Sequence, residues 1–84
     1  MYSVYIIECR DGRLYTGIAR DAEARFYLHA RGKGARFTRA NKPNKIVYLE
    51  RKRTRSTALK REYAIKQMDR SAKLELIQLA NHAV

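Results

Sequence analysis

The sequence predicts an α+β fold in one domain over residues 1–84: a small three-stranded antiparallel sheet flanked by helices, in the order ββαβαα. Three observations predict it. Two segments rich in β-branched and aromatic residues are joined by an Asp-Gly turn signal. A third such segment follows a long polar loop, and three further segments each begin with a helix-capping residue.

The two N-terminal segments predict a β-hairpin. Met1–Cys9 forms the first strand, and Leu14–Ile18 forms the second after the turn. Side chains alternate between the two faces of a strand, so Tyr5 and Tyr15 can lie on the same face of the hairpin. In the matching register, the two tyrosines are expected to be cross-strand neighbours.

The middle of the chain predicts a helix, a loop and a third strand. Asp21 is a suitable N-cap for a helix over Ala22–Arg31. Gly32–Asn44 is typical of a long loop, with a short helical turn expected near Phe37–Ala40. Ile46–Glu50 then predicts the third strand.

The last third of the chain predicts two helices. Ser56 is the expected cap of the first, which ends near Met68, and Ser71 is the expected cap of the second, which ends near Asn81. Apolar residues share one stripe of the second helix, so its expected role is mainly packing.

The charge of the chain points to a polyanionic partner. It has 19 Lys and Arg residues against 8 Asp and Glu, a formal net charge of +11. Such a surface binds phosphate backbones through counterion release, so nucleic acid is the expected partner. Membrane binding is disfavoured because no helix pairs a basic face with large apolar residues. A basic surface that serves only solubility remains the alternative.

The same composition excludes several classes of protein. No apolar run approaches the roughly 18 residues needed to cross a bilayer, and the N-terminus lacks a signal-peptide pattern, so a cytoplasmic location is expected. Cys9 is the only cysteine, which excludes an intramolecular disulfide and favours a buried strand residue.

A set of polar residues is expected to converge beside the hairpin. Arg25 and His29 lie four residues apart and therefore share one helix face, and the second strand leads Tyr15 into that helix. The chain lacks paired carboxylates, a Ser/His/Asp set and a phosphate-binding glycine loop. The remaining set suits phosphodiester chemistry, with Glu62 as the candidate metal carboxylate. Each residue also has a structural interpretation, and a solvent-facing Glu62 fits its helix equally well.

The stretch "SVYIIECRDGRLYTGIARDAEARFYLHARGKGARFTR" resembles the GIY-YIG nuclease superfamily, and more narrowly its small, stand-alone, single-domain bacterial members. The first motif corresponds to Ser3-Val4-Tyr5 and the second to Tyr15-Thr16-Gly17. The resemblance implies a divalent-metal-dependent endonuclease that uses one Mg²⁺ or Mn²⁺ ion. It implies that the catalytic residues are Tyr5, Tyr15, Arg25, His29 and Glu62, with Glu62 as the metal ligand.

The resemblance also implies roles for these residues. Arg25 is expected to stabilise the charge that grows on the phosphate, and His29 to accept a proton or orient the water. Tyr15 is favoured as the general base with Tyr5 as its partner, although these two roles can be exchanged. The favoured substrate is DNA, in repair or recombination and in a larger repair complex. The alternative is a non-catalytic nucleic-acid-binding protein; the oligomeric state is left open.

Three positions depart from the family pattern. Ser3 stands where the first motif begins with glycine, Ile18 stands where repair-type members often have lysine, and no late asparagine partner is found, since Asn81 is too near the end.

Gly17 either lets the backbone pass close to the site or serves packing.

A basic loop follows the candidate site residues. Its aromatic residue is expected either to stack on an unpaired base or to pack into the core. The cations around it are expected to contact phosphate. The nucleic-acid-binding candidates of this loop are Lys33, Arg36, Phe37, Arg39 and Lys42.

Overall fold

The fold is a three-stranded antiparallel sheet covered by helices on both faces, as predicted. The computed structural model describes residues 1–82. The strands are β1 (Tyr2–Cys9), β2 (Leu14–Ala19) and β3 (Pro43–Lys52), in the spatial order β2-β1-β3. The central position of β1 explains why its Val4–Ile7 segment is apolar without alternation, because both of its faces are buried.

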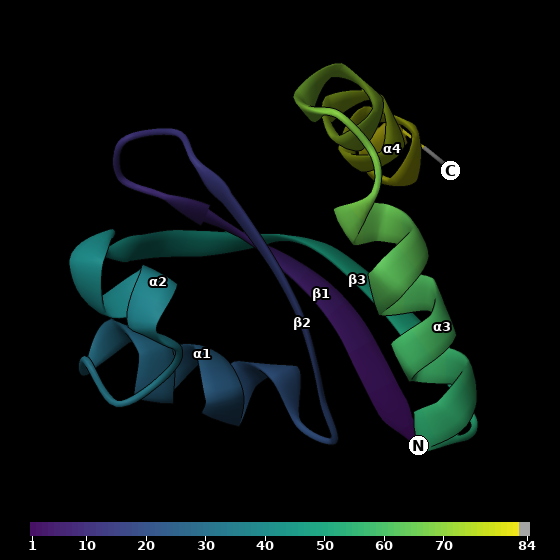
Figure 1. Ribbon diagram of the computed structural model, residues 1–84, viewed down its shortest axis with the longest axis horizontal. Helices are drawn as coiled ribbons and strands as arrows, with labels where there is room; N and C mark the ends of the chain where they lie inside the picture. Colours follow the sequence, from purple (N-terminus) through teal and green to yellow (C-terminus); the bar gives the residue numbers. More distant parts are fainter. Residues whose placement is uncertain (83–84) are drawn as a thin grey trace.

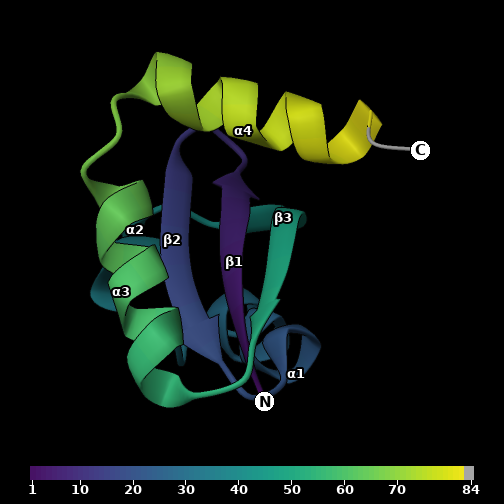
Figure 2. The ribbon, with the colours of Figure 1, turned by 90° about the vertical axis from the view of Figure 1, so that its right-hand side faces the viewer.

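The helices form two layers on opposite faces of the sheet (Figure 1). On one face, α1 (Ala22–Ala30) and the short α2 (Arg36–Ala40) cover a cluster that contains Tyr5 and Cys9. On the other face, α3 (Arg55–Lys66) and α4 (Arg70–His82) cover a cluster built around Ile6 and Ile65. In Figure 2, α3 runs along the β2 side of the sheet, while α4 crosses the end where the hairpin lies.

The hairpin register differs from the expected one. Tyr5 lies opposite Gly17, and Tyr15 lies opposite Ile7, so the two tyrosines are diagonal rather than direct neighbours. The Asp-Gly turn is confirmed, with Gly12 at a φ of 90° that glycine adopts without strain. The length of this turn sets the register, which composition alone did not fix.

Several element boundaries also differ from the prediction. β3 begins at Pro43 rather than Ile46, because proline is tolerated at the first residue of a strand. The cap of α3 is Thr54 rather than Ser56, and its hydroxyl accepts a hydrogen bond from the Thr57 N–H. At the start of α4, the Asp69 carboxylate accepts from Ala72, so Asp69 replaces Ser71 as the cap. The predicted cap Asp21 of α1 is confirmed.

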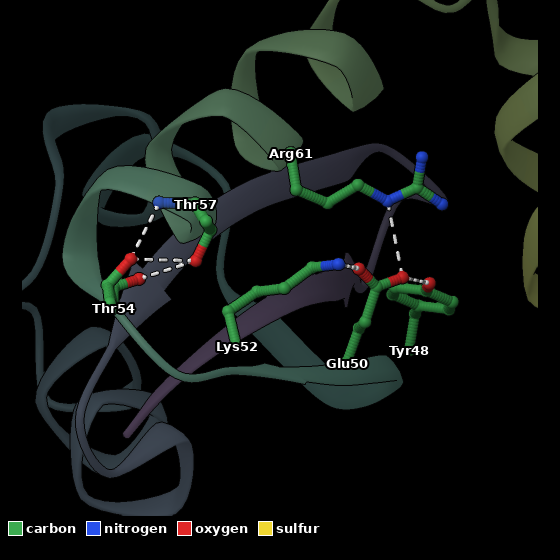
Figure 3. Close-up of polar contacts among 6 residues, drawn as sticks. All are labelled: Tyr48, Glu50, Lys52, Thr54, Thr57 and Arg61. Atoms are coloured by element: carbon green, nitrogen blue, oxygen red, sulfur yellow. Dashed lines mark hydrogen bonds and ion pairs between the residues drawn. The ribbon is translucent and has the colours of Figure 1, made fainter.

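A polar cluster between β3 and α3 fixes this helix against the strand (Figure 3). The Glu50 carboxylate accepts hydrogen bonds from the Tyr48 hydroxyl and from Nε of Arg61, the latter at 3.2 Å. Its second oxygen lies 2.9 Å from Nζ of Lys52. We call this set, Tyr48, Glu50, Lys52 and Arg61, the Glu50 cluster. Because Arg61 precedes Glu62 in α3, the cluster also sets the position from which Glu62 projects.

Within residues 1–82, no helix has the length and apolar character needed to cross a membrane.

Candidate active site at the β2 edge

The five predicted catalytic residues line one pocket at the free edge of β2. This pocket has a volume of about 320 Å³ and lies between α1 and α3. We call it the β2-edge pocket; it is lined by Tyr5, Tyr15, Gly17, Ile18, Arg25, His29, Lys33, Gly34, Ala35 and Glu62. Figure 1 looks onto this edge, with β2 in front of the other strands. The predicted convergence therefore holds in space, across 57 positions of sequence between Tyr5 and Glu62.

Tyr5 and His29 form a buried hydrogen-bonded pair on the floor of this pocket. Tyr5 Oη lies 3.1 Å from His29 Nε2, and both residues are only 2% exposed. Burial raises the pKa of Tyr5, and the neighbouring Tyr15 raises it further, so Tyr5 is held as a neutral phenol. Burial, followed by the charge of Arg25, lowers the pKa of His29, so the imidazole is neutral at pH 7. A neutral imidazole beside a phenol is suited to accept its proton.

The other nitrogen of His29 is fixed by two residues that sequence reasoning missed. Nδ1 lies 2.7 Å from Thr38 Oγ1 and 3.3 Å from the Ala35 N–H, and the Thr38 hydroxyl donates to the Ala35 carbonyl at 2.9 Å. Thr38 is 1% exposed. The Thr38 hydroxyl gives its own proton to the Ala35 carbonyl, so it accepts from Nδ1 when Nδ1 carries the proton, and Nε2 is then free to accept from Tyr5. The Ala35 N–H can donate only to an unprotonated Nδ1, so it forms no hydrogen bond in this tautomer. The loop thus holds the ring by Nδ1, the nitrogen that does not face Tyr5.

Two glycines let the pocket close tightly around these rings. A Cβ on Gly17 would lie 2.6 Å from Tyr5 Oη, so Gly17 allows the tyrosine ring to lie directly over the β2 backbone. A Cβ on Gly34 would collide with the His29 ring. Gly17 therefore serves close packing of a candidate catalytic side chain. The sequence places Gly34 only within the predicted loop Gly32–Asn44, because its contact with His29, five positions earlier, depends on the fold.

Tyr15 lies at the rim of the pocket rather than on its floor. Its ring centroid is 5.2 Å from that of His29 in an edge-on arrangement, and 5.8 Å from that of Phe37 in a stacked arrangement. Tyr15 is half-buried. It forms no hydrogen bond through its hydroxyl among residues 1–82, so its hydroxyl is free to face a substrate.

Arg25 and Glu62 supply the charges of the pocket. Arg25 is exposed, with no ion pair among the described residues. The Glu62 side chain is 17% exposed, and its carboxylate lies 3.5 Å from Nζ of Lys66, one helical turn later. Glu62 is the single carboxylate that lines the pocket. Within residues 1–82, no group of three His, Cys, Asp or Glu residues is placed to hold a metal ion.

The candidate residues of the basic loop lie at different places on the surface. Lys33 lines the β2-edge pocket, whereas Phe37 is half-buried against Tyr15 and lines a second cleft. The remaining candidates are exposed on α2 and after it, and line neither space: Arg36, Arg39 and Lys42.

Comparison with known proteins gives one consistent result. Residues 1–75 match the family described as the GIY-YIG catalytic domain. A UPF0213 protein of Staphylococcus epidermidis is 52% identical over 75 residues, which cover 89% of this chain and 92% of the relative. A UPF0213 protein of Staphylococcus aureus has the same identity and coverage. The solution NMR structure of the UPF0213 protein BH0048 from Bacillus halodurans matches with a TM-score of 0.61 and 39% identity, over 94% of this chain and 85% of that chain.

Proposed function

The chain belongs to the GIY-YIG catalytic-domain family, and on that basis we propose that it is a divalent-metal-dependent endonuclease that hydrolyses phosphodiester bonds of DNA. The observation that carries the proposal is the convergence of Tyr5, His29, Arg25 and Glu62 on one pocket. The proposed setting is DNA repair or recombination in the cytoplasm, alone or within a larger repair complex.

Glu62 is the proposed ligand of one Mg²⁺ or Mn²⁺ ion. Mg²⁺ in phosphoryl-transfer sites is commonly held by one or two carboxylates together with waters and substrate phosphate, so a single partly buried carboxylate fits this ion. When bound there, the ion would offset the negative charge that develops on a phosphate oxygen. Lys66, which contacts one oxygen of the same carboxylate, would compete with the ion for it.

Tyr5 and His29 are the proposed proton acceptor for the attacking water. A phenol with a raised pKa is a poor base alone, but Tyr5 passes its proton to Nε2 of His29 as it takes the proton of the water. The oxygen of that water then forms a bond to phosphorus, and the bond from phosphorus to the leaving oxygen breaks. This assignment favours Tyr5 over Tyr15, whose hydroxyl at the rim instead positions the substrate.

Arg25 is the proposed contact to the phosphate that is cut. Its guanidinium has no ion-pair partner among the described residues, and it lies on the same helix as His29. A guanidinium beside the phosphate stabilises charge that builds up on its oxygens during attack.

The test is cleavage of labelled single-stranded, duplex, flapped and branched DNA and RNA by the parent protein and by Glu62→Gln. Each substrate is incubated with Mg²⁺, with Mn²⁺ and with chelator, using proteins purified side by side to control for contaminating nucleases. Cleavage by the parent that disappears in Glu62→Gln and in chelator would support the proposal. Equal cleavage by parent and variant would refute the assignment of Glu62.

A second candidate function is nucleic-acid binding without cleavage. The net charge of +11 and the single carboxylate in the pocket favour it. Binding that weakens steeply with salt, without metal-dependent cleavage of any substrate, would identify this function.

A further inference from the structure

A second cleft opens on the same edge of β2, next to the β2-edge pocket. Its volume is about 250 Å³. We call it the Phe37 cleft; it is lined by Arg13, Leu14, Phe37, Arg70 and Lys73. Its cations come from the hairpin turn and from the first turn of α4, which crosses this end of the sheet (Figure 2). Arg70 reaches the hairpin: its Nη2 lies 3.8 Å from the position that a Cβ on Gly12 would take.

The cations of the Phe37 cleft are incompletely neutralised. Arg13 is paired with Asp11 at 3.1 Å, with both side chains largely exposed, so this pair contributes little stability. Arg70 and Lys73 have no ion-pair partner among the described residues. The nearest further acid in sequence, Asp69, uses its carboxylate to cap α4. Positive charge gathered in a concave surface without counter-charge attracts an anion.

The lining of the Phe37 cleft combines this charge with an aromatic surface. Phe37, which stacks on Tyr15, lines the cleft together with the half-buried Leu14. Cations that surround an apolar aromatic surface are the usual combination for a nucleotide whose base is not paired, since the base stacks while the phosphate meets the cations.

The two cavities are linked through the Tyr15–Phe37 stack. Tyr15 lines the β2-edge pocket, Phe37 lines the cleft, and their rings lie nearly parallel, with 22° between their planes. Gly17 at one cavity and Leu14 at the other are three residues apart on β2, a separation of about 10 Å. A single strand of nucleic acid that enters one cavity can therefore continue into the other.

We propose that the Phe37 cleft binds an unpaired nucleotide next to the phosphate that is cut, with its phosphate on Arg70 and Lys73 and its base against Phe37. This inference rests on the proposed function for the identity of the neighbouring site. It assigns a binding role to the first turn of α4, which the sequence indicated only for packing. A paired base cannot reach the cleft lining, so a substrate with unpaired nucleotides binds more tightly than a fully paired duplex.

The test measures DNA binding in chelator, where cleavage is blocked, by fluorescence anisotropy. The ligands are a duplex with a single-stranded flap and a fully paired duplex of equal length. The variants are Arg70→Ala/Lys73→Ala and a matched control, Arg53→Ala/Arg55→Ala, which removes the same charge from exposed residues at the start of α3. Phe37→Leu provides a variant that keeps both cations and removes the stacking ring.

The proposal expects the parent to bind the flap at least about fivefold more tightly than the duplex. Arg70→Ala/Lys73→Ala weakens flap binding about tenfold and makes the salt dependence shallower by about 0.7, the value for the one phosphate that the variant no longer neutralises. The control changes both affinities alike and by less than about threefold. Phe37→Leu reduces the preference for the flap while the salt dependence stays unchanged.

The inference is overturned if Arg70→Ala/Lys73→Ala weakens flap binding no more than the control double variant does. It is also overturned if the parent does not bind the flap more tightly than the duplex. Its failure is separable from that of the proposed function. Glu62-dependent cleavage with unaltered flap binding in Arg70→Ala/Lys73→Ala would reject the cleft and leave the nuclease. Selective loss of flap binding in a protein that never cleaves would keep the cleft and reject the nuclease.

Discussion

Two partly buried glutamates, Glu50 on β3 and Glu62 on α3, show how the same residue type serves different purposes. The Glu50 side chain is 23% exposed and is met by Tyr48, Lys52 and Arg61. The Glu62 side chain is 17% exposed, and among residues 1–82 it is met by Lys66 alone, at 3.5 Å. The oxygens of Glu50 are occupied by groups fixed in the sheet and the helix. Glu62 keeps capacity for a further ligand, for which the long side chain of Lys66 is the one competitor within residues 1–82.

The pKa of Glu50 reflects the partners that surround its carboxylate. Burial alone would raise it, but hydrogen bonds from Tyr48 and Lys52, together with the charge of Arg61, outweigh burial and lower the pKa below its ordinary value. An ionised carboxylate with one oxygen hydrogen-bonded to Tyr48 and Arg61 and the other paired with Lys52 contributes to stability and leaves little room for a metal ion. The comparison therefore separates a structural acid from a candidate ligand, although the two are similarly buried.

The largest expected effect comes from exchanging the two carboxylates for amides. Glu62→Gln should reduce metal-dependent cleavage by about 100-fold or more while changing the free energy of unfolding by less than about 1 kcal/mol. Glu50→Gln should instead lower the free energy of unfolding by about 2 kcal/mol, because Lys52 and Arg61 lose their partner. Denaturant unfolding and cleavage by the same two preparations measure both. The comparison fails if Glu50→Gln loses cleavage without losing stability.

The next largest effect is expected where the pocket has no room for a methyl group. Gly34→Ala should displace the His29 ring from Tyr5 and Thr38, and lower the rate of cleavage about tenfold with a cost of about 1–3 kcal/mol in stability. Gly32→Ala is the matched control, because it strains the same loop at a φ of 76° without any atom within 4 Å of the new Cβ. Equal effects of the two substitutions on cleavage would show that loop strain, rather than contact with His29, is responsible.

The sequence predicted the features that depend on short-range patterns. The Asp-Gly turn, the Asp21 cap and the pair Arg25 and His29 on one helix turn all depend on neighbours within a few positions. Glu62, which lies 33 positions after His29, was a candidate from its residue type alone, and the resemblance favoured it over a solvent-facing interpretation. All five candidates then met in one pocket, although their chemical roles stay predictions.

The parts that the sequence did not predict depend on long-range geometry. Thr38 is an ordinary loop residue until the fold places its hydroxyl 2.7 Å from His29. The Glu50 cluster joins a strand to a helix across 11 positions, and no local pattern marks it. The diagonal placement of Tyr5 and Tyr15 follows from the exact turn length. Each of these features requires knowledge of which surfaces face one another.

A smaller effect is expected from pH, and it should distinguish the two regions. The pKa of Glu50 is lowered, so its contribution to stability is complete above its ordinary value of 4.5 and declines as the pH falls below it. The pKa of His29 is lowered from 6.5, so cleavage should stay constant through pH 6.5 and decline only at lower pH, where the imidazole gains a proton. The free energy of unfolding, measured from about pH 3 upward to neutral pH, tests the Glu50 prediction. Single-turnover cleavage rates across neutral and mildly acidic pH test the His29 prediction. A rate that already falls above pH 6.5 would contradict a neutral His29 acceptor.

The smallest effect is expected at Lys66, and it tests whether Glu62 is available to a metal ion. Lys66→Met keeps the apolar stem of the lysine but removes the ammonium that lies 3.5 Å from the Glu62 carboxylate. A pair of this type within one helix contributes only about 0.3–0.5 kcal/mol, so stability should hardly change. The metal concentration that gives half-maximal cleavage should fall about twofold, since the ion no longer competes with the lysine. Lys60→Met on the same helix is the control, because Lys60 is exposed and does not line the pocket. A higher metal requirement in Lys66→Met would instead mean that the ammonium helps to bind the substrate phosphate, and that the lysine works with Glu62 rather than against the metal.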